Sequence, residues 1–328
     1  MFHRLHKVSL CVFLAILTTL MSVILAGCGG SSETPDLSDL SGVVNKITKS
    51  GPKDDGTPRP ESLNVLIPTA SGAVVYGNDL VSIDASNTSE GYVMVQYYGG
   101  VQKIKLQITN PDATVYTYTM TPGGYITFPL TGGNGAYHID VLENVNADLY
   151  ALAFAADMDV AIANEFSPYL YPNQYVWFTP ESAAVAKGEE LSKQSTSDLS
   201  YIQNVYHYVI ENIAYDEALA QNIATDYIPN VDNTLNTGMG ICFDYASLMS
   251  AMLRSQGIPT KLEVGYSGQA YHAWISAYVE EVGWIDRIIE FDGKDWSLID
   301  PTLAANNDSS SVGEYIGDGS NYTVKYSY

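Results

Sequence analysis

Short runs of alternating apolar and polar residues recur between Leu63 and about Val160, and this period of two constrains the fold more than any other feature of the chain. Tyrosine and β-branched residues fill the runs, and turn sequences such as TPGG and TGGNG separate them at spacings of about 8–12 residues. Successive side chains of a strand point to opposite faces, so each run can bury one face of a sheet. We therefore expect an antiparallel, immunoglobulin-like (Ig-like) β-sandwich over residues 62–165.

The pattern changes after Ser167–Ser182, a segment that contains three prolines and several aromatic residues. Beyond it, apolar residues from Leu199 to Ile213 fall on one face of a helix. His207 lies in the same stretch but off that face, which predicts a solvated surface histidine. A chain of 328 residues is long enough for two domains, and we expect the second over residues 166–328, which makes the chain α+β.

The N-terminus combines a basic start, an apolar run from Val8 to Ala26 and the sequence LAGC, which ends at Cys28. This arrangement resembles the signal peptide and lipobox of bacterial lipoproteins. The resemblance implies cleavage of residues 1–27, lipidation of Cys28 and anchoring to the extracytoplasmic face of the cell membrane. A plain transmembrane anchor is the alternative that the length of the run permits. The Gly-, Ser-, Pro- and Asp-rich residues 28–61 are typical of a flexible tether.

The chain is strongly acidic, with a formal net charge of −22 that becomes −24 when the two basic residues of the signal are removed. A charge of this sign repels phosphate backbones, so we expect no nucleic-acid partner. The aspartates and asparagines near the C-terminus lack the spacing of a calcium loop. We expect neither a metal site nor a cofactor.

Three cysteines are present, of which Cys11 would leave with the signal and Cys28 would carry lipid, so Cys242 has no disulfide partner. Cys242 follows the sequence GMGI, and apolar residues at helical spacing continue from it to Leu253 and stop before Gly257. We therefore expect Cys242 at the N-terminus of a helix. Unpaired N–H groups and the helix dipole lower the pKa of a thiol in that position.

Two strands and a hairpin are predicted after this helix. TKLEVGYS alternates as a strand, GQAYHAWISAYVEEV contains a second strand with His272, and IIEFDGKDWSLIDPT has the pattern of a hairpin that turns at Asp292 and ends at Asp300. Neighbouring antiparallel strands would bring His272 and Asp300 side by side. Together with Cys242 they indicate a Cys-His-Asp relay.

The run GMGICFDYASLMSAMLRSQGIPTKLEVGY, followed by HAWI and WSLIDPT, resembles the transglutaminase-like superfamily, a papain-like branch in which a cysteine-bearing helix precedes an antiparallel sheet. The similarity covers about residues 170–328 and keeps the order of the family's motifs. It implies that Cys242 is the nucleophile, His272 the imidazole and Asp300 the carboxylate that orients it. The spacing of Asn236 before the cysteine resembles that of the side-chain oxyanion donor in papain-like enzymes.

Three aromatic residues near these motifs, Trp274, Tyr245 and Tyr266, are candidates for the border of the substrate cleft. Packing in the core beside the site is the simplest role for Trp274 and for Trp296, and a wall of the acyl channel is the alternative for Trp274.

Residues 283–294 form an insertion before the final strand, either a lid or a longer hairpin. The length of this insertion affects how closely Asp300 can approach His272. Asp292 and Asp295 therefore stay open as alternative carboxylates.

The resemblance implies a surface-anchored thiol enzyme, a cysteine hydrolase or acyltransferase that cleaves or transfers peptide or isopeptide bonds through a thioester on Cys242. Hydrolysis is favoured, because transfer to an amine needs a site that excludes water and no feature of the sequence indicates one. The expected partner is an extracytoplasmic peptide or protein, including cell-wall-associated ones. The alternative is a non-catalytic lipoprotein that uses the same fold to bind a peptide, a cell-wall fragment or a glycan.

Overall fold

The computed structural model describes Arg59 and residues 65–267, 269–280, 283–286, 289–291, 296–298 and 322–328. The described residues all belong to one compact unit. The signal sequence, Cys28 and almost all of the tether lie outside these residues, so their assignments stay predictions, as do the domain limits. Among the helices that are described, none has both the length and the hydropathy of a membrane span.

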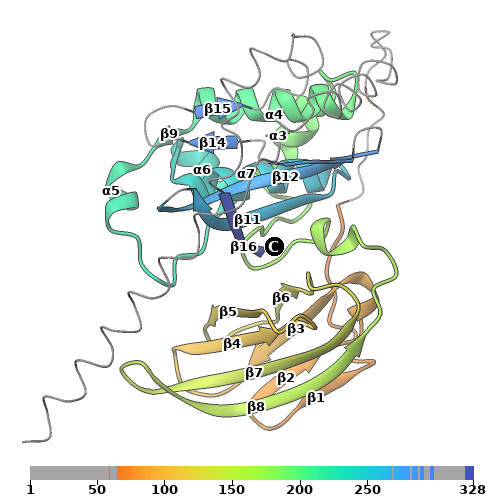
Figure 1. Cartoon of the computed structure of the whole chain (residues 1–328), viewed down its shortest axis with the longest axis vertical. Coiled ribbons are helices and arrows are strands. Elements are labelled where there is room, and N and C mark those ends of the chain that lie inside the picture. The colour runs from red at the N-terminus through yellow and green to blue at the C-terminus, as the bar shows by residue number, and fades with distance from the viewer. Residues whose placement is uncertain are drawn as a thin grey trace, which may run out of the picture. The chain divides into compact units, whose positions relative to one another are not determined.

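Two antiparallel sheets of four strands form the N-terminal β region (Figure 1). The strand order is β1-β2-β3-β6 in one sheet and β5-β4-β7-β8 in the other. The strands are β1 (Val75–Gly77), β2 (Val81–Asp84), β3 (Tyr92–Tyr97), β4 (Ile104–Thr109), β5 (Val115–Met120), β6 (Ile126–Pro129), β7 (Gly135–Asn146) and β8 (Leu149–Val160), with the 3-10 helix η1 (Thr88–Glu90) before β3.

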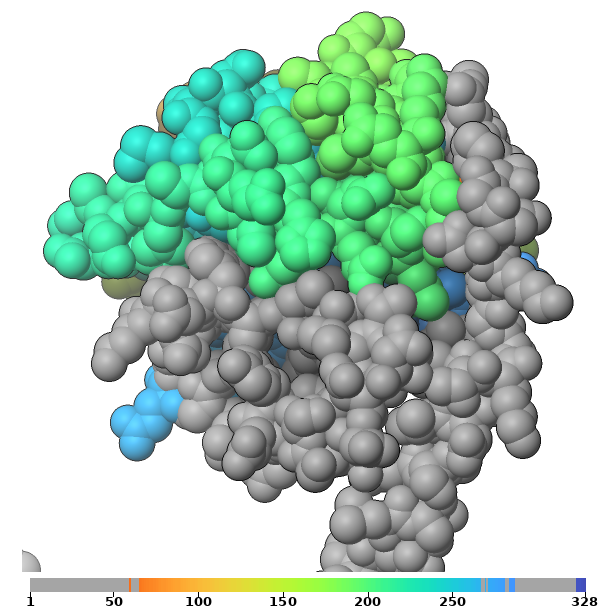
Figure 2. Space-filling model, turned by 90° about the horizontal axis from the view of Figure 1, so that it is seen from above, coloured from red at the N-terminus to blue at the C-terminus, as the bar shows by residue number. Residues whose placement is uncertain are grey.

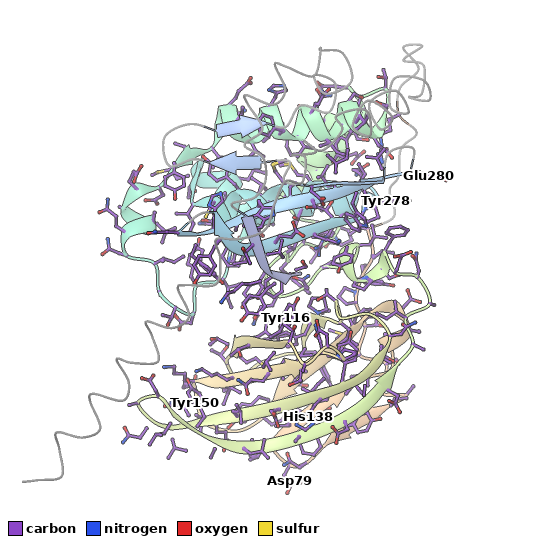
Figure 3. All side chains as sticks on the ribbon, in the orientation of Figure 1. Asp79, Tyr116, His138, Tyr150, Tyr278 and Glu280 are labelled. Carbon is purple, nitrogen blue, oxygen red and sulfur yellow. The ribbon has the colours of Figure 1, made fainter. Side chains whose placement is uncertain are left out.

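The predicted alternation is visible in β4, where Ile104, Leu106 and Ile108 are buried and the residues between them are partly exposed. The antiparallel strands expected over this region are confirmed, whereas an Ig-like sandwich topology stays a prediction. Tyr116 on β5 (Figure 3) accepts a hydrogen bond from the backbone N–H of Ser327 at 3.1 Å. This bond ties the N-terminal β region to the last strand of the chain.

Helices dominate the middle of the chain. They are η2 (Ser167–Tyr169), α3 (Ala183–Ser192), α4 (Asp198–Asn212), α5 (Glu217–Gln221), α6 (Val231–Thr237) and α7 (Cys242–Ser255). The predicted apolar face is confirmed in α4, where Ile202, Val205 and Val209 are buried, and His207 is exposed as expected. Helices α3 and α4 contact each other and lie side by side, in green, on the face shown in Figure 2.

Helix α7 packs against a third antiparallel sheet of order β13-β12-β11-β16. Every residue from Asp244 to Ser255 is buried, because α7 also contacts α3, α4 and α6. The sheet consists of β11 (Thr260–Ser267), β12 (Ala270–Val279), β13 (Gly283–Ile285) and β16 (Tyr322–Ser327), and a short parallel pair joins β9 (Ala214–Tyr215) to β10 (Met239–Gly240). The expected cysteine-bearing helix on an antiparallel sheet is therefore present.

The hairpin predicted around Asp292 forms as β14 (Ile289–Phe291) and β15 (Trp296–Leu298), which pair antiparallel. These two strands make a separate sheet, and the strands that pair with β12 are β11 and β13. The expectation that the strand leading to Asp300 pairs beside His272 is therefore wrong. Residues 283–285 of the insertion instead bond to the edge of β12.

A fully buried arginine joins three segments around α7. Arg254 donates from Nε and Nη2 to the carbonyl of Thr260 at 2.9 and 2.7 Å, from Nη1 to that of Tyr171 at 3.0 Å, and from Nη2 to that of Tyr328 at 2.6 Å. Burial lowers the pKa of Arg254 to about 9, so the guanidinium keeps its charge at neutral pH. Three backbone carbonyls in segments that surround α7 thus stabilise the positive charge of Arg254.

We expect Arg254→Met to lower the free energy of unfolding by about 3 kcal/mol or more, because the change removes the guanidinium's hydrogen bonds to three carbonyls, and a hydrogen bond to a charged group contributes about 1.5–3 kcal/mol. Urea denaturation followed by circular dichroism measures this loss. The matched control, Lys325→Met at an exposed position of β16, should change stability by no more than about 0.5 kcal/mol. Equal stability of the two variants would contradict a structural role for the arginine.

Candidate active site

Cys242 is the first residue of α7. The segment before it contains two positions, Gly238 and Gly240, at which a larger residue would be strained or would clash. Gly238 has a φ of +63°, and a Cβ on Gly240 would lie 2.7 Å from the Cβ of Asp244. The two glycines let the chain turn tightly into the helix. The thiol is thereby held at the N-terminus of α7, as predicted from the sequence, and it is partly exposed.

The pKa of the Cys242 thiol is raised, which corrects the lowering expected from its place on a helix. Burial is the largest cause, and the negative charge of Asp244 adds to it. The backbone N–H groups of Ala273, Phe243 and Cys242 act in the opposite direction, because they favour the negative charge of the thiolate. The helix N-terminus does stabilise the thiolate, but desolvation outweighs it because α7 is packed into the core.

His272 lies on β12, opposite Gly265 of β11, and only 8% of it is exposed. Its ring stacks beside that of Trp274, with the centroids 6.3 Å apart. Burial lowers the pKa of His272 to about 4, so the ring is neutral at neutral pH. Its Nε2 atom is buried without a hydrogen-bond partner, so it can still take up an acceptor.

The structure brings Cys242 and His272 to one cavity of about 510 Å³. Ala273, the residue after His272, also lines this cavity and its backbone N–H favours the Cys242 thiolate, so β12 passes beside the thiol. Asp300 lies outside the described residues, as do Asp292 and Asp295. The carboxylate of the predicted relay is therefore still a proposal.

Four other predicted site residues do not line this cavity. Asn236 is exposed on α6, so its role as an oxyanion donor stays a prediction. Tyr245 is buried in the core, where its hydroxyl donates to the carbonyl of Ile213, and Trp274 is buried with Nε1 donating to Glu263 at 2.8 Å. Tyr266 is partly exposed and lies outside the cavity.

The aromatic residues that do line the cavity were not among the site residues predicted from the sequence. Four rings form a continuous group, here called the aromatic wall: Tyr175, Phe243, Tyr326 and Tyr328. Tyr215, Tyr227 and Tyr271 complete the aromatic lining among the described residues. Among these residues, only Phe243 and Tyr271 are adjacent in sequence to Cys242 or His272. Sequence proximity to the motif residues could therefore have indicated these two but none of the others.

A buried carboxylate joins two segments that line the cavity. Asp244 accepts hydrogen bonds from the N–H of Ile241 at 2.9 Å and from the hydroxyl of Tyr227 at 2.6 Å. Burial raises the pKa of Asp244. The two bonds join the loop that carries Tyr227 to the first turn of α7 and so hold one side of the cavity against the thiol.

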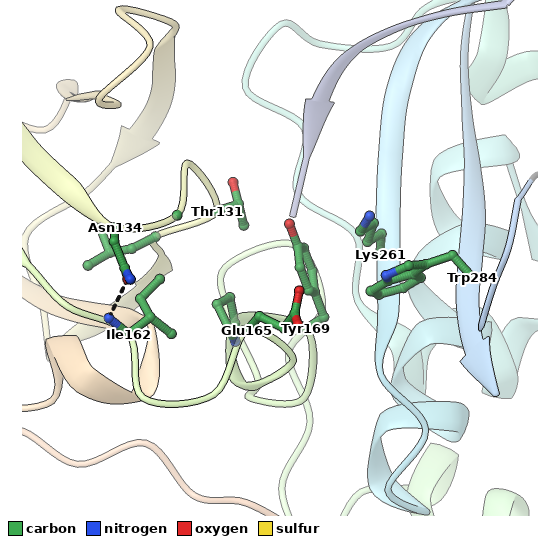
Figure 4. A pocket seen from close by; sticks show the side chains of 10 residues that line it. Thr131, Asn134, Ile162, Glu165, Tyr169, Lys261 and Trp284 are labelled. Carbon is green, nitrogen blue, oxygen red and sulfur yellow. Dashed lines mark hydrogen bonds between the residues drawn. The ribbon is translucent and has the colours of Figure 1, made fainter. Parts of the chain in front are cut away.

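Figure 4 shows a second cavity, of about 280 Å³. In it the nitrogen of Lys261 lies 3.9 Å from the ring centroid of Trp284, and Asn134 accepts a hydrogen bond from the N–H of Ile162 at 2.7 Å. Its described lining residues include neither Cys242 nor His272. Within the described part of the chain, no cluster of His, Cys, Asp and Glu could hold a metal ion.

The chain is similar to three solved structures: a candidate cysteine protease from Cytophaga hutchinsonii (13% identity, 78% of this chain and 74% of that one, TM-score 0.33), a candidate protease from Parabacteroides distasonis (12%, 63% and 62%, 0.28) and red sea bream transglutaminase (13%, 66% and 48%, 0.23). No curated protein matches the chain.

A family match covers the centre of the site. Residues 186–287 match the transglutaminase-like superfamily. This range contains both Cys242 and His272 and ends before Asp300. The chain therefore carries a transglutaminase-like domain over residues 186–287.

Proposed function

We propose that the protein is a thiol enzyme that cleaves or transfers amide bonds through a thioester on Cys242. The observation that carries the proposal is that Cys242 and His272 line the same cavity, together with Ala273 of β12. A thiol at a helix N-terminus beside an imidazole has the parts that a nucleophile and its base require. The transglutaminase-like domain supports a thiol enzyme family.

The chemistry follows from the protonation states. At neutral pH the imidazole is neutral and the thiol is protonated, so His272 takes the thiol proton as the sulfur attacks the carbonyl carbon. The carbon–sulfur bond forms, and His272 then returns the proton to the leaving amine as the carbon–nitrogen bond breaks. Water or a second amine next attacks the thioester and restores the thiol.

Backbone N–H groups stabilise the oxyanion that develops on the oxygen of the attacked carbonyl. The first N–H groups of an α-helix have no partner within the helix, so those of Cys242 and Phe243 in the first turn of α7 can donate to an anion. Both N–H groups already favour the ionised form of the neighbouring Cys242 sulfur. We propose that the N–H of Cys242 meets the oxyanion and that one further donor completes the site.

Trapping the thioester tests this function. We expect a peptide amide substrate to leave an acyl adduct on Cys242 that acid quenching preserves, that hydroxylamine removes and that mass spectrometry detects. Products should be mainly free acids, with amides formed when a primary amine is added. The Cys242→Ser variant should give no hydroxylamine-sensitive adduct. A thiol that forms no adduct with any amide, and that reacts with iodoacetamide at a rate independent of His272, would instead favour the binding protein.

The cellular setting rests on the N-terminal sequence. We propose that lipid on Cys28 tethers the enzyme to the extracytoplasmic membrane surface, where its substrates are peptides or proteins. Globomycin-sensitive processing and metabolic labelling with a fatty acid test this assignment independently of catalysis.

A further inference from the structure

The walls of the Cys242 cavity are built largely of rings. Within the aromatic wall, the Tyr175 centroid lies 5.3 Å from that of Phe243 and 4.7 Å from that of Tyr328, and Tyr326 lies 6.2 Å from Tyr328. Tyr271, next to His272, is 58% exposed at the rim. The cavity volume of about 510 Å³ falls within the usual range of small-ligand sites.

The aromatic wall is held in place before any substrate binds. Tyr328 exchanges two backbone hydrogen bonds with Leu262, at 2.8 and 3.0 Å, and its carbonyl also accepts from Arg254. Tyr326 packs edge-to-face on Tyr116 with centroids 5.0 Å apart. A wall ordered in this way loses little entropy when a ligand packs against it.

The cavity is unfavourable to charge. None of its described lining residues is Lys, Arg, Asp or Glu. Burial raises the pKa of Tyr215 to about 12, raises that of the Cys242 thiol and lowers that of His272 to about 4, so each group is pushed towards its neutral form. The nearby Asp244 has both oxygens bonded elsewhere. A charged substrate side chain would therefore lose its hydration without gaining a partner.

We propose that the acyl donor places an uncharged aromatic ring against the aromatic wall, so that substrates with Phe or Tyr beside the attacked carbonyl are preferred. The inference rests on the proposed function. Ring edges and faces offer further attraction to another ring beyond the area buried, which distinguishes an aromatic group from an aliphatic one of similar size.

A set of peptide vinyl sulfones that differ only in the residue beside the reactive group tests the preference. We expect the second-order rate of Cys242 modification to be several-fold higher for Phe than for Leu, and at least about tenfold higher for Phe than for Lys or Glu. Equal or faster reaction of the Gln, Lys or Glu compounds would overturn the inference. Mass spectrometry of the intact full chain gives the rates.

Variants separate the wall from general damage. Tyr326→Leu, and independently the rim variant Tyr271→Leu, should lower the ratio of Phe to Glu rates several-fold. Val324→Ala, an exposed position on the same strand as Tyr326, should leave the ratio unchanged. An unchanged ratio in both tyrosine variants would overturn the assignment of the wall.

Iodoacetamide distinguishes failure of this inference from failure of the proposed function, because the reagent carries no recognition group. Modification of Cys242 by iodoacetamide that depends on His272, together with no ring preference among the vinyl sulfones, overturns the inference alone. Modification that does not depend on His272 overturns the proposed function as well.

Discussion

Replacing His272 with Ala is expected to lower amide turnover by about 10³-fold, within the range that general acid–base help supplies. The raised pKa of Cys242 is the reason the effect should be large. Without the imidazole, the partly buried thiol has to ionise unaided in surroundings that disfavour the thiolate. The substrate is the peptide amide whose sequence matches the fastest-reacting vinyl sulfone. Its turnover at neutral pH by the wild type and by His272→Ala gives the ratio.

The control for this variant is His207→Ala. His207 is exposed on α4 and lines neither cavity, so its loss should leave turnover unchanged. His272→Ala also removes a ring stacked on buried Trp274, so thermal unfolding of both variants should be compared. Loss of activity in His207→Ala equal to that in His272→Ala would contradict a chemical role for His272.

Local sequence rules placed the elements of the site well. The predicted helix after Cys242 is α7 (Cys242–Ser255), and the strand predicted from TKLEVGYS is β11 (Thr260–Ser267). Both follow from patterns that short stretches contain, a period of 3.6 that ends at Gly257 and a period of two. Element type and order were therefore predictable from the sequence.

The residues that line the cavity, the direction of the Cys242 pKa shift and the pairing of strands with β12 depend on tertiary packing, which the sequence patterns did not predict. The aromatic wall takes Tyr175 from the segment before α3 and Tyr326 and Tyr328 from the end of the chain, so no local pattern joins them. The sequence predicted a lowered pKa for Cys242, whereas the structure raises it. A helix N-terminus is a local feature that the sequence shows, but burial depends on every element packed around α7. The predicted pairing of the strand that leads to Asp300 was wrong for the same reason, since residues 283–285 pair with the edge of β12 instead.

Replacing Asp300 with Asn is the second change expected to have a large effect, a loss of about 10²–10⁴-fold in amide turnover. His272 presents a buried Nε2 atom without a hydrogen-bond partner, and a buried ring N–H that lacks an acceptor is costly. The motif WSLIDPT resembles that of the family's orienting carboxylate. We therefore propose that Asp300 accepts this hydrogen bond and fixes the tautomer that leaves the other ring nitrogen free to take the thiol proton.

The pKa of His272 discriminates this role of Asp300 from a structural one. Burial alone lowers that pKa to about 4, and an ionised carboxylate beside the ring would raise it. Because the ring must be neutral to accept the proton, kcat/KM falls as pH drops through this pKa. The fall should therefore lie above about pH 4 in the wild type and move down to about pH 4 in Asp300→Asn, in step with the NMR titration of labelled His272. Asp292→Asn and Asp295→Asn are the matched controls, and a downward shift in one of them, with none in Asp300→Asn, would transfer the role to that residue.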